Sequence, residues 1–102
     1  MADRLDLHND LVSLLGSDHV YYQPPESVKL VYPCFVYGLN DIDTRSADDI
    51  SYKRIRGYSV IYIGKDPDTK MIDKVLDKFR YCRYDRRYVA DNLYHDAFII
   101  YY

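Results

Sequence analysis

The chain of 102 residues has the length of one domain, and 48% hydrophobic with 29% charged residues is the composition of an ordinary folded protein. We find no apolar stretch near the roughly 18–20 residues that a membrane span needs, which argues against a membrane protein. The net charge of −2 removes the simplest electrostatic case for general nucleic-acid binding, while 13 tyrosines without a tryptophan favour half-buried sheet faces and subunit contacts.

The first predicted element is an amphipathic helix over residues 2–15, in which leucines recur at three- and four-residue spacing. Gly16 follows it and is placed to end the helix in the left-handed conformation. Residues 19–22 predict a short strand. Pro24 and Pro25 stop this strand, because proline cannot donate to a sheet ladder.

Two tyrosine-rich apolar runs, residues 32–37 and 58–63, predict longer strands. Pro33 in the first run marks a sheet edge, a bulge or the start of the strand. The second run has apolar residues on both faces, which predicts a central strand. The charged segment 38–57 between them is either a loop or a long β-hairpin arm. With roughly eight residues a side at ~3.3 Å per residue, such an arm extends ~25 Å.

A second helix is predicted from the apolar spacing of residues 71–79, with charged residues on its opposite face. Asp66 is the predicted N-cap of this helix and Pro67 its first helical residue, which places Asp68 near the positive end of the helix dipole. The turn 64–69 is therefore expected to lead directly into the helix.

Two more strands complete the chain, the first over 81–85 and the second over 97–102, with a turn-rich segment 88–92 between them. The order of elements is helix, short strand, two longer strands, helix, two strands. Such an order predicts a single α+β domain over 1–102 with both helices on one face of the sheet.

Catalytic chemistry has little support in this sequence. His95 lies between Asp91 and Asp96, the pattern of a base with an orienting carboxylate, but no recognisable nucleophile motif accompanies it. We therefore expect no enzymatic activity and no catalytic residues. A small enzyme remains an alternative, and it predicts a pocket that unites His95 with a nucleophile from elsewhere in the fold.

Metal and cofactor sites are not expected either. The carboxylates at 41–43 and 48–49 lack the order of an EF-hand and have Arg45 among them. Cys34 and Cys82 each lie in an apolar or aromatic run, where cysteine behaves as a small buried hydrophobe. No glycine-rich phosphate loop is present.

The run 80–88 alternates arginine with tyrosine, which is typical of sheet surfaces that stack RNA bases. It lacks the glycine-aromatic order of the common RNA-binding strand motif. Tyrosine and arginine are equally enriched in protein–protein hot spots. An RNA-binding module therefore stays open as an alternative to a protein-contact surface.

Four strings carry a family resemblance, at residues 32–37, 41–48, 66–68 and 91–98. In this order and spacing they resemble the tail terminator, or tail completion, proteins of bacteriophages with long non-contractile tails. The match covers most of the chain from Tyr32 to the C-terminus. Other neck proteins, the head completion adaptors and stoppers, are similar small stacking proteins and remain an alternative.

The resemblance implies a mixed sheet packed against two helices and a hexameric ring in the neck of the virion, assembled in the cytoplasm of the host bacterium. Such a ring caps the tail tube, binds the tail tube protein and the head-side connector or stopper, and lets DNA pass through its lumen without specific binding. It requires no cofactor, metal or membrane. We expect the segment 38–57 to protrude as an arm that contacts the adjacent subunit. The candidate interface residues are Asp41, Asp43, Arg45, Asp48, Tyr52, Arg54, Arg56, Arg86 and Arg87.

Overall fold

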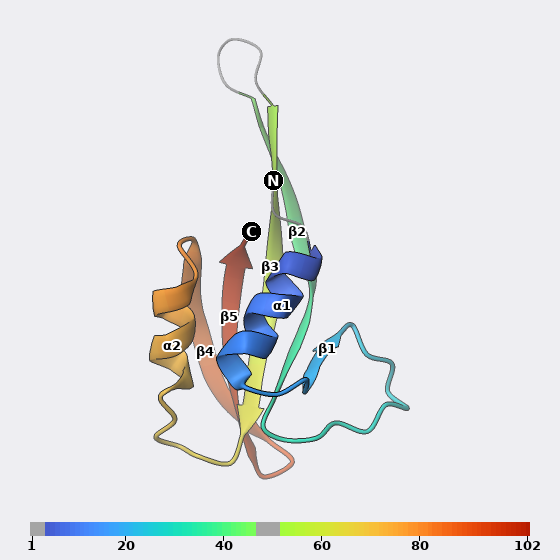
Figure 1. Ribbon diagram of the computed structural model, residues 1–102, viewed down its shortest axis with the longest axis vertical. Coiled ribbons are helices and arrows are strands. Elements are labelled where there is room, and N and C mark those ends of the chain that lie inside the picture. The colour runs from blue at the N-terminus through green and yellow to red at the C-terminus, as the bar shows by residue number, and fades with distance from the viewer. Residues whose placement is uncertain (1–3, 47–51) are drawn as a thin grey trace.

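Strand β3 (Tyr52–Gly64) lies at the centre of a five-stranded mixed sheet. It pairs antiparallel with β2 (Cys34–Ser46) on one side and with β5 (Leu93–Tyr101) on the other. The outer strands are β1 (Val20–Tyr22), parallel to β2, and β4 (Cys82–Ala90), antiparallel to β5. The sheet order is thus β1-β2-β3-β5-β4 (Figure 1). The predicted α+β fold and the central position of residues 58–63 are confirmed.

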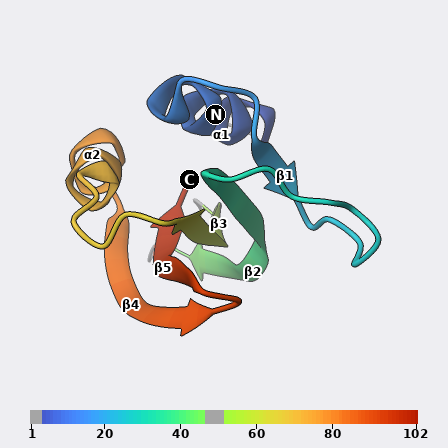
Figure 2. The same ribbon diagram turned by 90° about the horizontal axis from the view of Figure 1, so that it is seen from below.

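This computed structural model describes residues 4–46 and 52–102, with the side chains of residues 41–46 and 52–55 excepted. The two helices, α1 (Arg4–Leu15) and α2 (Met71–Lys78), lie on the same side of the curved sheet (Figure 2). Both helices on one face were expected from the order of elements. Neither described helix is long and apolar enough to cross a membrane.

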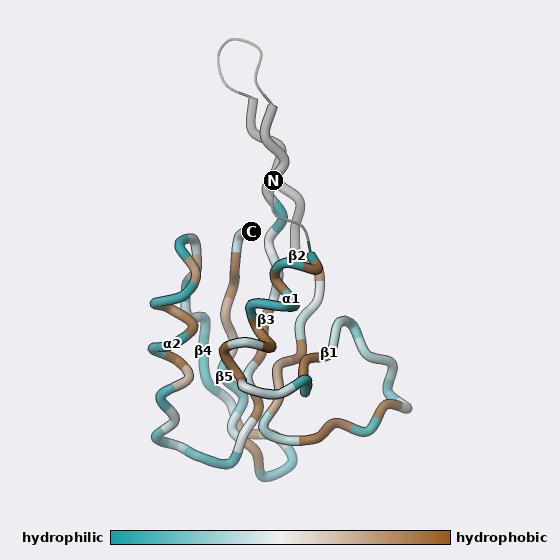
Figure 3. The backbone as a smooth tube through the Cα atoms, viewed as in Figure 1, coloured by the Kyte–Doolittle hydropathy of each residue, from teal (hydrophilic) through white to brown (hydrophobic). Residues whose placement is uncertain are grey.

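The main core lies between the helices and the sheet. Leu7 and Leu11 of α1 are fully buried there, and α2 contributes Val75. Figure 3 shows apolar and polar residues alternating around α2, as the spacing of its apolar residues requires. The sheet side of this core consists mainly of side chains from β2, β3 and β5: Phe35, Tyr37, Tyr58, Val60, Tyr62, Phe98 and Ile100.

A smaller apolar cluster covers part of the opposite sheet face, which we call the open face because neither helix packs on it. Cys34, Ile63 and Leu93 are buried in this cluster. Leu30, from the loop before β2, and Ile61 pack against it. Because side chains on both faces of β3 are covered, its sequence lacks the apolar–polar alternation of a half-exposed strand.

The end of α1 agrees with its sequence, whereas the start of α2 does not. Gly16 has φ +78° and its N–H donates to the Val12 carbonyl, as a helix-ending residue does. The prediction of Asp66 as N-cap was wrong, because α2 begins at Met71. The Asp66 carboxylate accepts a hydrogen bond from the N–H of Asp68 at 2.9 Å, which closes a local turn instead of starting a helix.

The two long strands extend well beyond the apolar runs that predicted them. β2 starts at Cys34, directly after Pro33, and its pairing with β3 continues to Ser46↔Tyr52. Residues 47–51 lie outside the described part of the chain. A protruding hairpin arm over 38–57 therefore stays a prediction.

Candidate interaction surfaces

A bulge in β4 divides its arginine- and tyrosine-rich run between the two faces of the sheet. Tyr84 lies opposite Phe98 and Arg86 lies opposite Ala97, so Asp85 is an extra residue in the ladder. The extra residue shifts the alternation of side chains by one position. Arg87, rather than Arg86, consequently joins Tyr84 on the helix-covered face.

Tyr84 and Arg87 both bind Asp96, which is the one buried carboxylate among the described residues. Asp96 is 1% exposed, and its Oδ1 accepts hydrogen bonds from Arg87 Nε at 2.8 Å and from the Tyr84 hydroxyl at 2.9 Å. Arg87 also donates from Nη2 to Asp96 Oδ2 at 3.2 Å and from Nη1 to the Pro67 carbonyl at 2.7 Å. A buried charge requires such partners. Arg87 therefore holds β4, β5 and the loop before α2 together.

The pKa shifts agree with this geometry. Hydrogen bonding to Asp96 raises the pKa of the Arg87 guanidinium. Burial, followed by the hydrogen bond and the charge of Asp96, raises the pKa of Tyr84. Both shifts favour the protonated forms of Arg87 and Tyr84, which donate to Asp96.

The outward residues of β4 give the open face its charge. Arg83 and Asp85 lie 3.8 Å apart as an exposed ion pair. The Arg86 guanidinium lies 5.5 Å from the ring centroid of Tyr88, and that ring stacks on His95 at 4.8 Å. Arginine and tyrosine side chains thus form a partly exposed surface along β4, of the composition that protein interfaces favour.

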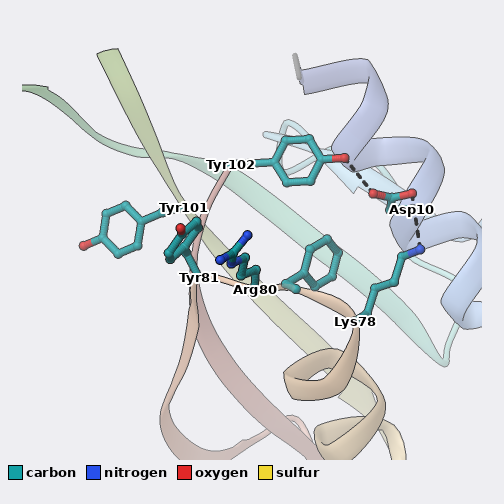
Figure 4. A pocket seen from close by; sticks show the side chains of 7 residues that line it. Asp10, Lys78, Arg80, Tyr81, Tyr101 and Tyr102 are labelled. Carbon is teal, nitrogen blue, oxygen red and sulfur yellow. Dashed lines mark hydrogen bonds and ion pairs between the residues drawn. The ribbon is translucent and has the colours of Figure 1, made fainter. Parts of the chain in front are cut away.

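A groove lies at the end of the sheet, between α1 and the C-terminal end of α2, with a volume of about 310 Å³ (Figure 4). The Tyr102 hydroxyl donates to Asp10 Oδ2 at 2.6 Å, and Lys78 Nζ lies 3.8 Å from Asp10 Oδ1. Tyr81 is 63% exposed beside Arg80, whose guanidinium lies 5.5 Å from its ring centroid. An exposed ring beside a cation is suited to anchoring a partner.

The helix α1 is attached to the sheet by a polar cluster around Tyr37, which is 1% exposed. Arg4 donates to the Tyr37 hydroxyl at 3.1 Å, and His8 Nδ1 lies 2.8 Å from the same oxygen. Since Arg4 donates to that oxygen, the hydroxyl proton is available for Nδ1 of a neutral His8. Burial and the Arg4 charge both lower the pKa of His8, which favours that neutral form.

The carboxylate–histidine pairing considered for His95 does not form. His95 is on the open face, where its Nδ1 lies 3.1 Å from the Leu93 carbonyl, whereas the neighbouring Asp96 points to the helix-covered face. Burial raises the pKa of both Cys34 and Cys82 to about 11, which makes these thiols poor nucleophiles. Among the described residues no group of three potential ligands is placed to hold a metal ion.

The residues proposed as an interface from sequence fall into two groups at different strands. Asp41, Asp43, Arg45, Tyr52, Arg54 and Arg56 belong to β2 and β3, where Arg56 is exposed and the other side chains are outside the description, while Asp48 lies entirely outside it. Arg86 and Arg87 belong to β4, beyond β5. Within one chain the structure does not bring the two groups together.

Asp10 and Tyr102 contribute to these surfaces but were not singled out from the sequence. Tyr81 lies in the tyrosine–arginine run, whose alternation was a usable signal for it. The contact between Asp10 and Tyr102 joins residues 92 positions apart, so no local sequence pattern predicts it. Comparison with known proteins adds no assignment, because no family model, curated protein or solved structure matches the chain.

Proposed function

We propose that this chain is a structural protein of the virion neck in a long-tailed bacteriophage, a tail terminator whose ring caps the tail tube and joins it to the head connector. The proposal starts from the resemblance of four sequence strings to that family. The fold agrees with what the resemblance implies, since a mixed sheet packs against two helices on one face. A neck protein of this kind acts through its surfaces and has no catalytic site.

The observation that carries the proposal is the separation of two charged segments on one sheet. The charged candidates 41–56 belong to the neighbouring strands β2 and β3. The arginine-rich strand β4 is the edge strand at the other end of the strand order, beyond β5. Two different surfaces on opposite sides of a subunit suit a head-to-tail contact, and such contacts close into rings when the rotation permits. In this mechanism the 38–57 segment contacts the adjacent subunit through Asp41, Asp43 and Arg45.

Electron microscopy of virions tests the proposal. A tagged chain located by labelling is expected in the neck, between tube and connector. A phage without a working copy is expected to make tubes longer than normal, because nothing stops tube growth. Normal tube length with heads that fail to join indicates an adaptor or stopper instead, and label anywhere outside the neck refutes the proposal.

An RNA-binding module is the second candidate, and one observation favours it. Arg83, Arg86 and Tyr88 share the open face of the sheet, as basic and aromatic residues do in sheet-surface RNA binders. Tyr88 is however stacked on His95 and has the Arg86 guanidinium over its ring, so less of this ring is free for a base.

Fluorescence anisotropy with a labelled single-stranded RNA separates the two functions. An RNA-binding module predicts affinity that falls steeply with salt and is lost in Arg83→Gln/Arg86→Gln. Lys70→Gln/Lys74→Gln, which removes the same charge at the N-cap and within the first turns of α2, is the matched control. A neck protein predicts weak binding that both double variants reduce equally.

A further inference from the structure

The strand β4 forms one edge of the sheet, and no strand in the described parts of the chain lies beside its outer edge (Figure 1). An open edge of nine residues offers unpaired N–H and C=O groups to another strand. Near its two ends lie Tyr81 and Val89, each 63% exposed, the most exposed large apolar side chains among the described residues. The edge is therefore accessible to a partner.

The pairing of β4 with β5 shows which backbone groups of β4 face this open edge. The turn residues 91–92 have positive φ, the backbone of a two-residue hairpin turn, so the flanking pair Ala90↔Leu93 is hydrogen-bonded. Hydrogen-bonded and non-hydrogen-bonded pairs alternate along an antiparallel ladder. The N–H and C=O of Val89 are therefore directed away from β5, and the same holds for Arg87, two residues earlier.

The other end of the ladder gives an independent reference. The N–H of Tyr101 donates to the carbonyl of Tyr81 at 2.8 Å, so this carbonyl faces β5. Alternation from this pair directs the backbone groups of Cys82 and Tyr84 to the open edge. The bulge at Asp85 separates the two halves of the strand. The edge-facing positions of β4 are thus Cys82, Tyr84, Arg87 and Val89.

The edge-facing positions are self-complementary. Their separations along the chain are two, three and two residues, which is the same sequence of spacings in both directions. Because the bulge accommodates the extra residue, they lie opposite every second residue of β5, as in a regular strand. Two antiparallel copies of β4 can therefore pair all four positions at once.

We propose that the outer edge of β4 pairs with β4 of a second copy of this chain about a two-fold axis, with Cys82 opposite Val89 and Tyr84 opposite Arg87 of that copy. One antiparallel sheet then continues through both subunits. The pairing concerns the free chain and does not rest on the proposed function. A ring that caps a tube has two different faces and no two-fold axis between neighbouring subunits, so ring assembly has to replace this contact.

Charge and side-chain type favour this register. It sets Asp85 opposite Arg86 of the second copy, and the two-fold axis repeats this pair, so opposite charges meet on the open face of the sheet. It also sets Arg83 opposite Tyr88, a cation beside an aromatic ring. No arginine of β4 lies directly opposite another arginine.

Neighbouring registers are less favourable. A shift by one edge-facing position in one direction leaves Cys82 unpaired and sets Arg87 directly opposite Arg87 of the second copy, where like charges repel. A shift in the other direction leaves Val89 unpaired, with its apolar side chain still exposed. The proposed register pairs all four positions without either cost.

Reversal of the charges at the bulge tests the contact. Asp85→Arg alone and Arg86→Asp alone each set like charges opposite each other, so we expect monomers from both in light scattering after gel filtration. The double variant D85R/R86D and an equal mixture of the two single variants restore opposite charges, so we expect dimers from both, as from the wild type. Dimers from the single variants, or no dimers from the double variant and the mixture, overturn the proposal.

Glu26→Arg and Lys29→Asp are the matched controls for charge reversal. Both side chains are exposed in the loop after β1, at the other end of the strand order from β4. We expect both variants to remain dimeric. Circular dichroism spectra equal to that of the wild type show that every variant is folded, and loss of the dimer in these two controls contradicts the assignment to β4.

Disulfide trapping covers a dimer that is too weak to survive gel filtration. Arg83→Cys chains are mixed with Tyr88→Cys chains, all carrying Cys82→Ala, and oxidised. Positions 83 and 88 form a non-hydrogen-bonded pair in the proposed register, the kind in which opposing Cβ atoms lie closest. We expect more crosslinked pairs from the mixture than from either chain alone. A monomeric wild type without this preference overturns the inference.

Discussion

Arg87 and Asp96 lie directly opposite each other on β4 and β5, and their closest atoms, Nε and Oδ1, are 2.8 Å apart. The pair exists only because the bulge at Asp85 moves Arg87 onto the face of Asp96. Arg87 binds the carboxylate of Asp96, which is 1% exposed, whereas its neighbour Arg86 lies on the other face of the sheet. Adjacent residues of the same type thus have different roles.

Arg87→Met is expected to lower the free energy of unfolding by at least about 2 kcal/mol, because it leaves the buried Asp96 carboxylate short of donors. Arg86→Met is the control and is expected to stay within about 0.5 kcal/mol of the wild type. Urea denaturation followed by circular dichroism measures both. Equal effects of the two substitutions contradict the assignment of Arg87 as the partner of the buried Asp96 carboxylate.

Sequence reasoning found the elements whose signal is local. Leucine spacing predicted α1, and Gly16 predicted where this helix ends. Apolar residues on both faces of the run 58–63 predicted the central strand β3. Each of these patterns lies within a single element. The prediction at Asp66 failed because an aspartate before proline has two uses, capping a helix or closing a turn, and the sequence does not distinguish them. Here the Asp66 side chain bonds Asp68, and the helix starts later.

The candidate surfaces were predictable only in part. The tyrosine–arginine run was evident, but its division between two faces depends on the single extra residue Asp85, and strand alternation without that bulge assigns Arg86 and Arg87 to the wrong faces. Contacts such as Asp10 with Tyr102 depend on the packing of chain ends that are distant in sequence. Neither feature has a local signature.

Stability is expected to fall below about pH 6.5 through His8, whose pKa in the fold is lowered from the ordinary 6.5. The folded state favours the neutral imidazole, so its contribution is fully present above the unfolded pKa and is lost as the pH falls through the folded pKa. Urea midpoints at pH 7.5 and 5.5 are compared for wild type, His8→Gln and the control His19→Gln. If the wild type loses no more stability between pH 7.5 and 5.5 than His8→Gln does, the role of His8 is contradicted.

Gly16→Ala is expected to destabilise the chain by about 1 kcal/mol, because φ of +78° is costly for a residue with a Cβ atom. No heavy atom lies within 4 Å of the position of that Cβ, so steric contact with the rest of the fold adds nothing. Gly16→Asn separates the two causes, since asparagine tolerates the left-handed region better. In thermal denaturation the melting temperature should be highest with glycine at position 16, lower with asparagine and lowest with alanine. Equal melting temperatures for alanine and glycine contradict the explanation.

Tyr102→Phe is expected to cost about 1 kcal/mol of unfolding free energy, because it removes the 2.6 Å hydrogen bond to the Asp10 carboxylate that joins the end of the chain to α1. Lys78→Gln removes the other partner of Asp10, but that pair is 3.8 Å apart with side chains 45% and 33% exposed, so its loss is expected to matter little. Urea denaturation gives the two changes, and hydrogen exchange of the α1 amides shows whether the helix itself is loosened. Two results contradict the view that this hydroxyl attaches the helix to the sheet. One is a larger loss of unfolding free energy in Lys78→Gln than in Tyr102→Phe. The other is unchanged protection of the α1 amides from hydrogen exchange in Tyr102→Phe.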